Sequence, residues 1–299
     1  MVSAPHWHVL GAGAIGCLFA AALRRAGCEV TLLLREGSLP GEREVLIERD
    51  RGTERLVLPT STPAAENAID HLLVTTKAYD VAQAVAGVRH RLREQSQVLL
   101  LANGMGFAAE VTRDAPWLQL FHGTTTEGAW RIAPLHVRHA GRGTTRIGRN
   151  GVARPAPWFR CWRDGLPDCI WDPDIDRALW LKLAINCAIN PLTALHRCVN
   201  GELARRPELA AEVARLCDEI AAISAAAGYA EAAQDIHEAV AAVIAATAAN
   251  RSSMLQDVLA GRRTEIEHIT GYLLAVAGRC GIEAPRNRAV MAAFGDPVR

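Results

Sequence analysis

The chain has 299 residues, half of them hydrophobic, and its 33 lysines and arginines nearly balance 32 aspartates and glutamates. That length predicts two domains, because single hydrophobic cores stop growing near it. The balanced charge, with no long run of lysine or arginine, argues against a nucleic-acid partner. Every apolar run is interrupted before the roughly 18 residues of a membrane span, and the N-terminal residues lack the sections of a signal peptide. We therefore expect a cytoplasmic protein that binds neither nucleic acid nor membrane.

Cysteines and lysines carry different information. The eight cysteines are scattered, without a C-x-x-C pair or histidines at metal-ligand spacing, so we expect buried free thiols and no metal. Only Lys77 and Lys182 among the 33 basic residues are lysines. A codon bias toward arginine on the surface would explain this, but arginine cannot release a proton, whereas burial tunes the pKa of lysine. The two lysines are therefore candidate functional residues.

The first half of the chain alternates strand and helix patterns. Residues 6–35 read as a strand, a tight turn, a helix and a second strand. The apolar runs 71–76 and 98–103 are typical of buried parallel strands, and the segment 81–93 between them has helical spacing. After Trp117, short glycine-punctuated strands predict an antiparallel extension that covers an edge of the sheet.

The tight turn has the sequence GAGAIG, which matches G-x-G-x-x-G between a predicted strand and a predicted helix. Gly11 permits the turn, Gly13 lets a pyrophosphate approach the backbone, and Gly16 lets the helix pack on the strand. A turn without a ligand would not need three glycines, which cost backbone entropy. The motif predicts a nicotinamide dinucleotide, and the N–H groups at the start of the helix add further residues to this site: Ala12, Ala14 and Ile15.

Arg35 ends the second strand, where NAD-binding domains usually carry an acid for the ribose 2′-hydroxyl. A guanidinium can instead bind a 2′-phosphate through two hydrogen bonds. The alternative is a surface charge paired with Glu36. We expect NADP(H) as the cofactor.

The second half of the chain is helical. Pro173 and three aspartates mark a boundary within 171–180, and residues 209–250 are rich in alanine, the best helix former. We predict an α/β fold in which an N-terminal Rossmann-type domain with an antiparallel extension, residues 1–172, precedes an all-α domain, residues 173–299.

A polar stripe marks the first long helix of the second half. Lys182, Asn186 and Asn190 are spaced i, i+4 and i+8, so they share one narrow face of an otherwise apolar helix. Buried ammonium and amide groups need polar partners. We expect this stripe to line a substrate cleft that faces the first domain. The alternative is a solvated stripe, although surface helices usually have a wider polar face.

Polar residues gather again between 250 and 267. Thr264 and Glu267 match a capping box, which gives Glu267 a structural role at position N3 of a helix. Glu265 falls in the predicted first turn, where the helix dipole favours any carboxylate, so the pattern leaves its role open.

Together these motifs resemble the ketopantoate reductase family. The resemblance rests on stretches that span both predicted domains: VLGAGAIG, LLVTTKAYD, LLANGMG, HGTTTEGA, WLKLAINCAINPLTAL, VNGEL and NRSSMLQDVLAGRRTEIEHITGYLL. It implies an NADP-dependent 2-dehydropantoate 2-reductase, which transfers a hydride to the C2 ketone of ketopantoate and yields D-pantoate for pantothenate and coenzyme A biosynthesis.

The resemblance also implies roles for single residues. Lys182 matches the general acid, and Glu265 matches the acidic residue that holds the substrate hydroxyl near that lysine. Arg35 matches the residue that binds the 2′-phosphate, and Lys77 and Asn103 match residues at the junction of cofactor and active site. The implied substrate-binding residues are Asn103, Asn186, Asn190, Ser253 and Glu265, to which we add Asn250.

Two departures from the family pattern bear on specificity. Asp80 stands where the family often has an amide that helps to hold the 2′-phosphate, and Ala102 where a polar residue is more usual. They affect the expected preference for NADPH over NADH and would fit a paralogue that reduces another branched 2-keto acid. A non-catalytic NADPH-binding regulator is a further alternative, although it would not need the polar stripe. For the assembly, a homodimer stays open.

Overall fold

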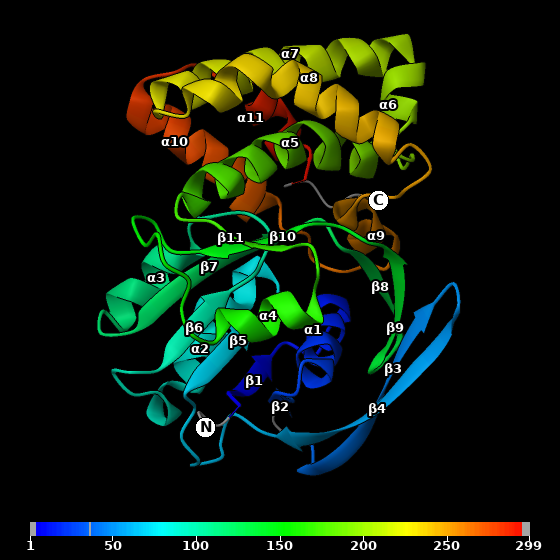
Figure 1. Ribbon diagram of the computed structural model, residues 1–299. Helices are drawn as coiled ribbons and strands as arrows, with labels where there is room; N and C mark the ends of the chain where they lie inside the picture. Colours follow the sequence, from blue (N-terminus) through cyan, green and yellow to red (C-terminus); the bar gives the residue numbers. More distant parts are fainter. Residues whose placement is uncertain (1–3, 36, 295–299) are drawn as a thin grey trace. The chain divides into compact units, whose positions relative to one another are not determined.

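The structure is a computed structural model that describes residues 4–35 and 37–294, and it divides into two units (Figure 1). The first unit contains the chain up to Ala102 together with Phe107–Ile175. The second contains Asn103–Gly106 together with the chain from Asp176 onward. The predicted boundary, 172/173, lies three residues before the change of unit at Asp176, and the short excursion at Asn103 was not foreseen.

The first unit is built on one sheet. Its strands are β1 (His6–Leu10), β2 (Glu29–Leu33), β3 (Gly41–Arg49), β4 (Gly52–Ser61), β5 (His71–Val74), β6 (Gln97–Leu100), β7 (Gln119–Thr125), β8 (Gly128–Ala133), β9 (His136–Gly141), β10 (Thr145–Gly148) and β11 (Cys169–Trp171). They lie in the order β11-β10-β7-β6-β5-β1-β2-β4-β3-β9-β8. The predicted runs 71–76 and 98–103 form β5 and β6, which pair in parallel as expected.

Helices cover both faces of the central parallel strands. The helices are α1 (Ala14–Arg25), η1 (Ala78–Asp80), α2 (Val81–Gly87), η2 (Arg89–Arg91), α3 (Phe107–Asp114) and α4 (Phe159–Gly165). Alternate residues of each strand enter opposite cores: Leu73 and Leu99 pack with α1 and α4, whereas Leu72 and Val98 pack with α2 and α3. Burial on both faces explains why these strands are continuous apolar runs in the sequence.

The predicted antiparallel extension after Trp117 is present, and antiparallel pairing occurs at both ends of the sheet. At one end β10 runs antiparallel to β7, while β7 itself is parallel to β6. At the other end β3 and β4 form a hairpin that residue patterns did not predict, and β8 pairs with β9. The strands β3 and β4 carry many exposed charged residues, so their apolar alternation is weak.

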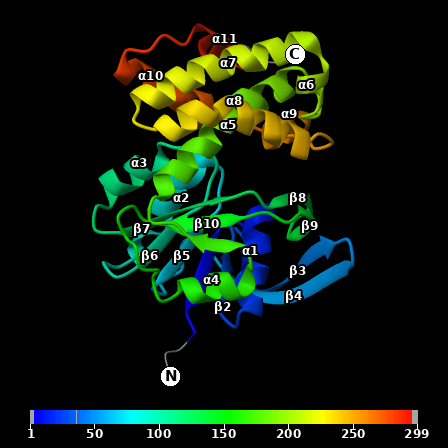
Figure 2. The ribbon, with the colours of Figure 1, turned by 45° about the horizontal axis from the view of Figure 1, so that its top comes forward.

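The second unit has helices and connecting loops, and no strand among the residues that the structure describes. Its helices are α5 (Ile175–Leu195), α6 (Glu202–Arg205), α7 (Pro207–Ala226), α8 (Ala230–Ala246), α9 (Ser253–Leu259), the π-helical turn η3 (Glu267–Gly271), α10 (Tyr272–Cys280) and α11 (Pro285–Ala292). Figure 2 shows α7 and α8 side by side. Their apolar faces and that of α10 bury α5, which contributes Trp180, Leu183 and Leu192 to the core.

The cysteines and the apolar helix α5 can be compared with what the sequence predicts. All eight cysteines are free thiols, five of them buried and three half-buried. By length and composition, α5 is the one described helix that could cross a membrane, but 61% of its apolar window is buried within the protein. It also carries Lys182, Asn186 and Asn190, polar residues that are rare within membrane spans. Its burial is typical of the core helix of a folded domain.

Candidate functional site

The predicted cofactor residues follow the carboxyl ends of neighbouring parallel strands. The glycine turn begins directly after β1, Arg35 lies two residues after β2, and Lys77 lies three residues after β5. In the sheet order, β5, β1 and β2 are adjacent. Residues at this edge of an open parallel sheet form the usual ligand-binding crevice of α/β domains.

Close packing explains two glycines of the turn. Gly11 has a φ of +109°, and its carbonyl oxygen accepts hydrogen bonds from the N–H of Gly13 and the hydroxyl of Thr75, both at 2.7 Å. A Cβ on Gly16 would lie 2.1 Å from that same carbonyl oxygen. Gly11 therefore makes the turn, and Gly16 lets the first turn of α1 sit directly on it.

At Gly13 the backbone is not covered by other atoms, which would allow a pyrophosphate to approach it. Gly13 caps α1 with an ordinary φ of −85°, and no heavy atom lies within 4 Å of the place where a Cβ would stand. The first turn of α1 contains no acidic residue, so its positive end can receive an anion. Beside the turn, the hydroxyl of Thr76 is buried without a hydrogen-bond partner among the described residues. The turn thus has the donors and the space that a dinucleotide requires.

The remaining predicted cofactor residues are accessible around this turn. Ala12, Ala14 and Ile15 are half-buried in or next to the start of α1. Arg35 is exposed, while Glu36 lies outside the described residues. Lys77 is half-buried, and Asp80 is half-buried directly before α2.

The polar stripe lies on α5 as the spacing predicted. Asn190 is 6% exposed, and Lys182 and Asn186 are half-buried, in a helix that otherwise contributes to the apolar core. Pro191 lies inside the helix and cannot donate to the carbonyl of Cys187. This stretch of α5 therefore carries an ammonium group, two amides and a backbone carbonyl that lacks its usual helical hydrogen bond.

Burial changes the protonation of Lys182. Loss of solvation lowers the pKa of its ammonium group from 10.5 to about 8, and the negative charge of Glu265 opposes part of this shift. Glu265 itself is 4% exposed. A lysine with a pKa near neutrality can exchange a proton during catalysis, which an ordinary surface lysine does poorly.

The loop that follows β6 forms hydrogen bonds with Glu265 and with the helical segment after it. The Asn103 side chain donates from Nδ2 to Oε2 of Glu265 at 3.2 Å, and the N–H of Met105 donates to the carbonyl of His268 at 3.0 Å. A Cβ on Gly104 would lie 2.3 Å from that carbonyl oxygen, so only glycine allows this approach. Asn103 was predicted to bind both cofactor and substrate, and its amide hydrogen-bonds to the carboxylate of Glu265, a predicted catalytic residue.

The predicted capping box does not form. The helical segment begins at Ile266 without a side-chain cap, and the carbonyl of Glu265 accepts from the N–H groups of His268 and Ile269. Glu267 is exposed and forms an ion pair with Arg263. Glu265 directly precedes the helical segment instead of lying in its first turn, and η3 winds as a π-helical turn that residue spacing did not predict. Such turns occur frequently at functional sites.

Asn250 and Ser253 flank the start of α9. Both side chains are exposed, whereas Ser252 between them is 7% exposed and caps α9 by accepting from the N–H of Leu255 at 3.0 Å. The carbonyl of Asn250 accepts from the N–H of Asn200. The predicted substrate residues of this segment are therefore held by backbone and cap contacts.

Several polar residues near these segments were missed. Thr75 and Thr76 adjoin the glycine turn, and their position as polar residues at the carboxyl end of the predicted strand 71–76 could have identified them. Asn200 is 7% exposed and its Oδ1 has no partner among the described residues, while its Nδ2 donates to Thr247. Asn200 belongs to the VNGEL stretch, which was noted only as a motif.

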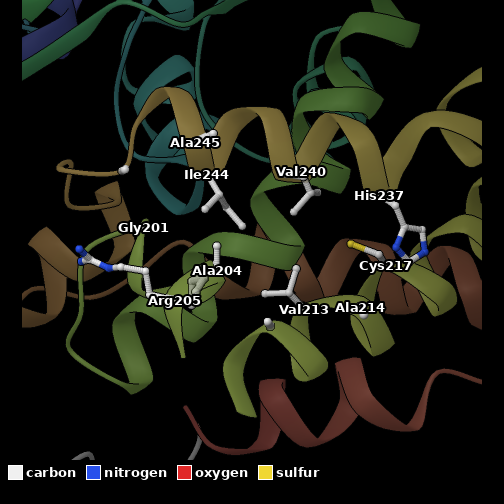
Figure 3. A pocket seen from close by; sticks show the side chains of 14 residues that line it. Gly201, Ala204, Arg205, Val213, Ala214, Cys217, His237, Val240, Ile244 and Ala245 are labelled. Carbon is white, nitrogen blue, oxygen red and sulfur yellow. The ribbon is translucent and has the colours of Figure 1, made fainter. Parts of the chain in front are cut away.

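A separate apolar cavity of about 420 Å³ lies among α6, α7 and α8. Figure 3 shows Val213, Val240 and Ile244 pointing into it, with Arg205 and His237 at its ends. None of the predicted site residues lines this cavity. Its apolar lining does not provide the polar groups that a keto acid requires.

Comparison with known families agrees with this division of the chain. Residues 7–151 match the model of "Ketopantoate reductase PanE/ApbA", and residues 174–296 match that of "Ketopantoate reductase PanE/ApbA C terminal". The chain belongs to the ketopantoate reductase family. The two matches cover the glycine turn and the polar stripe in turn.

Members of the ketopantoate reductase family resemble the chain over almost its full length. It is 39% identical over 281 residues to the 2-dehydropantoate 2-reductase of Shigella flexneri, covering 93% of this chain and 90% of that one. A crystal structure of a family member from Ralstonia eutropha JMP134 has a TM-score of 0.82 at 27% identity and covers 96% of both chains. D-mandelate dehydrogenase with NADH and anilino(oxo)acetate shares the fold, with a TM-score of 0.85 at 21% identity and 97% of both chains covered.

Proposed function

We propose that this chain reduces 2-dehydropantoate to D-pantoate with NADPH, as the names of its relatives suggest. The observation that carries the proposal is the half-buried Lys182, which lies on a polar stripe near Glu265 and has its pKa lowered to about 8 by loss of solvation. The family match supports the substrate, and the open glycine turn supports a nicotinamide dinucleotide. Neither the polar stripe with Lys182 nor the open glycine turn is required for the stability of the fold.

The bound cofactor would supply the hydride that C2 of the keto acid accepts. The developing negative charge then falls on the ketone oxygen, where Lys182 Nζ donates a proton and stabilises the charge as it forms. Glu265 keeps the ammonium form of Lys182 populated, since its charge raises the lysine pKa. The Asn103 amide, 3.2 Å from Oε2 of Glu265, orients that carboxylate.

The other predicted residues would bind the two ends of the substrate. The amides of Asn186, Asn190 and Asn250 and the hydroxyl of Ser253 can donate to the substrate carboxylate and ketone. A second oxygen of Glu265 can accept from the substrate hydroxyl. This set suits a small, branched hydroxy-keto acid with one negative charge.

For the cofactor, we expect Arg35→Ala to raise the KM for NADPH by about tenfold and to leave that for NADH nearly unchanged. Arg35 is exposed after β2, where a guanidinium can bind the 2′-phosphate that NADH lacks. Steady-state kinetics with both cofactors measure this difference. Equal effects on NADPH and NADH would contradict the assignment. Asp80→Asn should increase the preference for NADPH over NADH, because it removes a negative charge that would repel the 2′-phosphate.

The pH dependence of reduction should follow Lys182. The protonated lysine is the acid, and its pKa is lowered to about 8, so kcat/KM should be constant below this pH and fall as pH rises through it. Oxidation of the hydroxy acid should show the opposite trend, because it needs the neutral amine. Glu265→Gln removes the charge that raises this pKa and should move the fall to lower pH. A wild-type profile that stays flat to pH 10 would contradict a lysine acid.

Two alternatives are separated by the choice of substrate. The proposed function predicts faster turnover of ketopantoate, because Glu265 would bind its hydroxyl group. Preferential turnover of a branched 2-keto acid that lacks this hydroxyl would instead favour a paralogous reductase. NADPH binding without turnover of any keto acid would favour a regulator. Ketopantoate reduction that depends on Lys182 would support the proposal.

A further inference from the structure

Two buried hydroxyl groups connect α5 to the segment that precedes α9. Thr193 is fully buried and Ser252 is 7% exposed, and their Oγ atoms lie 2.7 Å apart. The residues are 59 positions apart in the sequence, so this hydrogen bond joins two distant parts of the helical unit. Neither side chain is among the residues predicted to bind substrate or cofactor.

The connection extends to the backbone at both ends. Thr193 Oγ1 lies 2.9 Å from the carbonyl oxygen of Asn190, and Ser252 Oγ accepts from the N–H of Leu255 at 3.0 Å. The Thr193 hydroxyl has one proton to donate, and Ser252 Oγ at 2.7 Å and the Asn190 carbonyl oxygen at 2.9 Å share it as acceptors. A series of close polar contacts therefore runs from the backbone of Asn190 through Thr193 and Ser252 to the first turn of α9.

Both ends of this series of polar contacts adjoin proposed substrate residues. Asn190 lies at one end, and Asn250 and Ser253 flank Ser252 at the other. The helix is weakened near Asn190, because Pro191 removes the donor that would bond the carbonyl of Cys187. The Thr193–Ser252 hydrogen bond joins this part of α5 to the segment that precedes α9.

We propose that Thr193 and Ser252 are positioning residues, which set the separation between Asn190 and the Asn250–Ser253 segment so that both bind the same keto acid. The inference rests on the proposed function and adds to it the contact that aligns the substrate amides. Loss of the contact should misplace substrate donors while the glycine turn, in the other unit, keeps its geometry. Small misplacements of binding groups can cost up to about a hundredfold in rate.

The test compares Thr193→Val, Thr193→Ser and Ser252→Ala in steady-state kinetics with ketopantoate and NADPH. Thr193→Val keeps the side-chain shape without the hydroxyl, and we expect it to raise the KM for ketopantoate about tenfold, with the KM for NADPH unchanged and a smaller fall in kcat. Thr193→Ser should restore the wild-type KM. Ser252→Ala should raise the KM for ketopantoate as Thr193→Val does and should also lose thermal stability, because it removes the cap of α9 as well. The KM of the double variant should be little higher than that of Ser252→Ala, because both substitutions remove the same contact.

Ser224→Ala is the matched control. Ser224 is fully buried in the same unit and accepts from Trp180 Nε1 at 2.9 Å, so its loss also removes one buried hydrogen bond to α5. We expect a similar decrease in thermal stability and an unchanged KM. An unchanged KM in Thr193→Val and Ser252→Ala, or an equal rise in Ser224→Ala, would overturn the inference. If the wild-type chain does not reduce ketopantoate, the proposed function fails first and the inference fails with it.

Discussion

Replacing Lys182 by alanine should lower kcat for ketopantoate reduction by about 10²- to 10⁴-fold, the usual contribution of a positioned general acid. Lys182 is one of two lysines in the chain, lies on the stripe of α5, and has a pKa lowered to about 8 by burial. Stopped-flow or steady-state oxidation of NADPH measures the loss. The dissociation constant of NADPH should change little, since the glycine turn that would bind it lies in the other unit.

Lys182→Arg separates proton transfer from charge. Arginine keeps the positive charge but does not release a proton at accessible pH, so this variant should also be slow and should lose the fall of kcat/KM near pH 8. Near-normal activity in Lys182→Arg would leave the residue only an electrostatic role. Near-normal activity in Lys182→Ala would show that another group protonates the product.

Gly13→Ala should weaken NADPH binding by at least about tenfold without destabilising the protein. A Cβ at this position meets no heavy atom within 4 Å and the φ of −85° suits alanine, so the fold should tolerate the change. The methyl group would instead occupy the space by which a pyrophosphate approaches the backbone at the N-terminus of α1. Fluorescence titration of NADPH and thermal unfolding measure the two effects.

Gly16→Ala provides the comparison, because it tests packing at the same turn. Its Cβ would lie 2.1 Å from the carbonyl oxygen of Gly11, so this variant should lose thermal stability as well as cofactor affinity. The pair separates a glycine kept for ligand approach from one kept for the fold. Unchanged NADPH affinity in a stable Gly13→Ala would contradict the dinucleotide site.

Local patterns in the sequence were sufficient for the central fold. The glycine turn, the apolar runs of β5 and β6 and the polar stripe of α5 each depend on neighbouring residues, and each could be predicted from spacing. The hairpin of β3 and β4 was missed because its residues alternate weakly between apolar and polar. The π-helical turn η3 was also missed, because Thr264 and Glu267 fit a capping box equally well in the sequence.

The contacts within the candidate site depend on distant residues and could not be predicted in this way. The bond of Asn103 to Glu265 spans 162 positions, and that of Thr193 to Ser252 spans 59. The sequence pattern left the role of Glu265 open, whereas its burial and its effect on the pKa of Lys182 favour a functional role. Residue type and spacing identify candidates, but tertiary packing determines which candidates meet.

The most direct test of the proposed function is the reaction of the purified chain with NADPH and ketopantoate, followed by the loss of reduced nicotinamide and by identification of the product. We expect one D-pantoate for each NADPH oxidised, slower turnover with the keto acid that lacks the hydroxyl, and almost none in Lys182→Ala. Intact NADPH binding with no consumption of ketopantoate would contradict the proposed function.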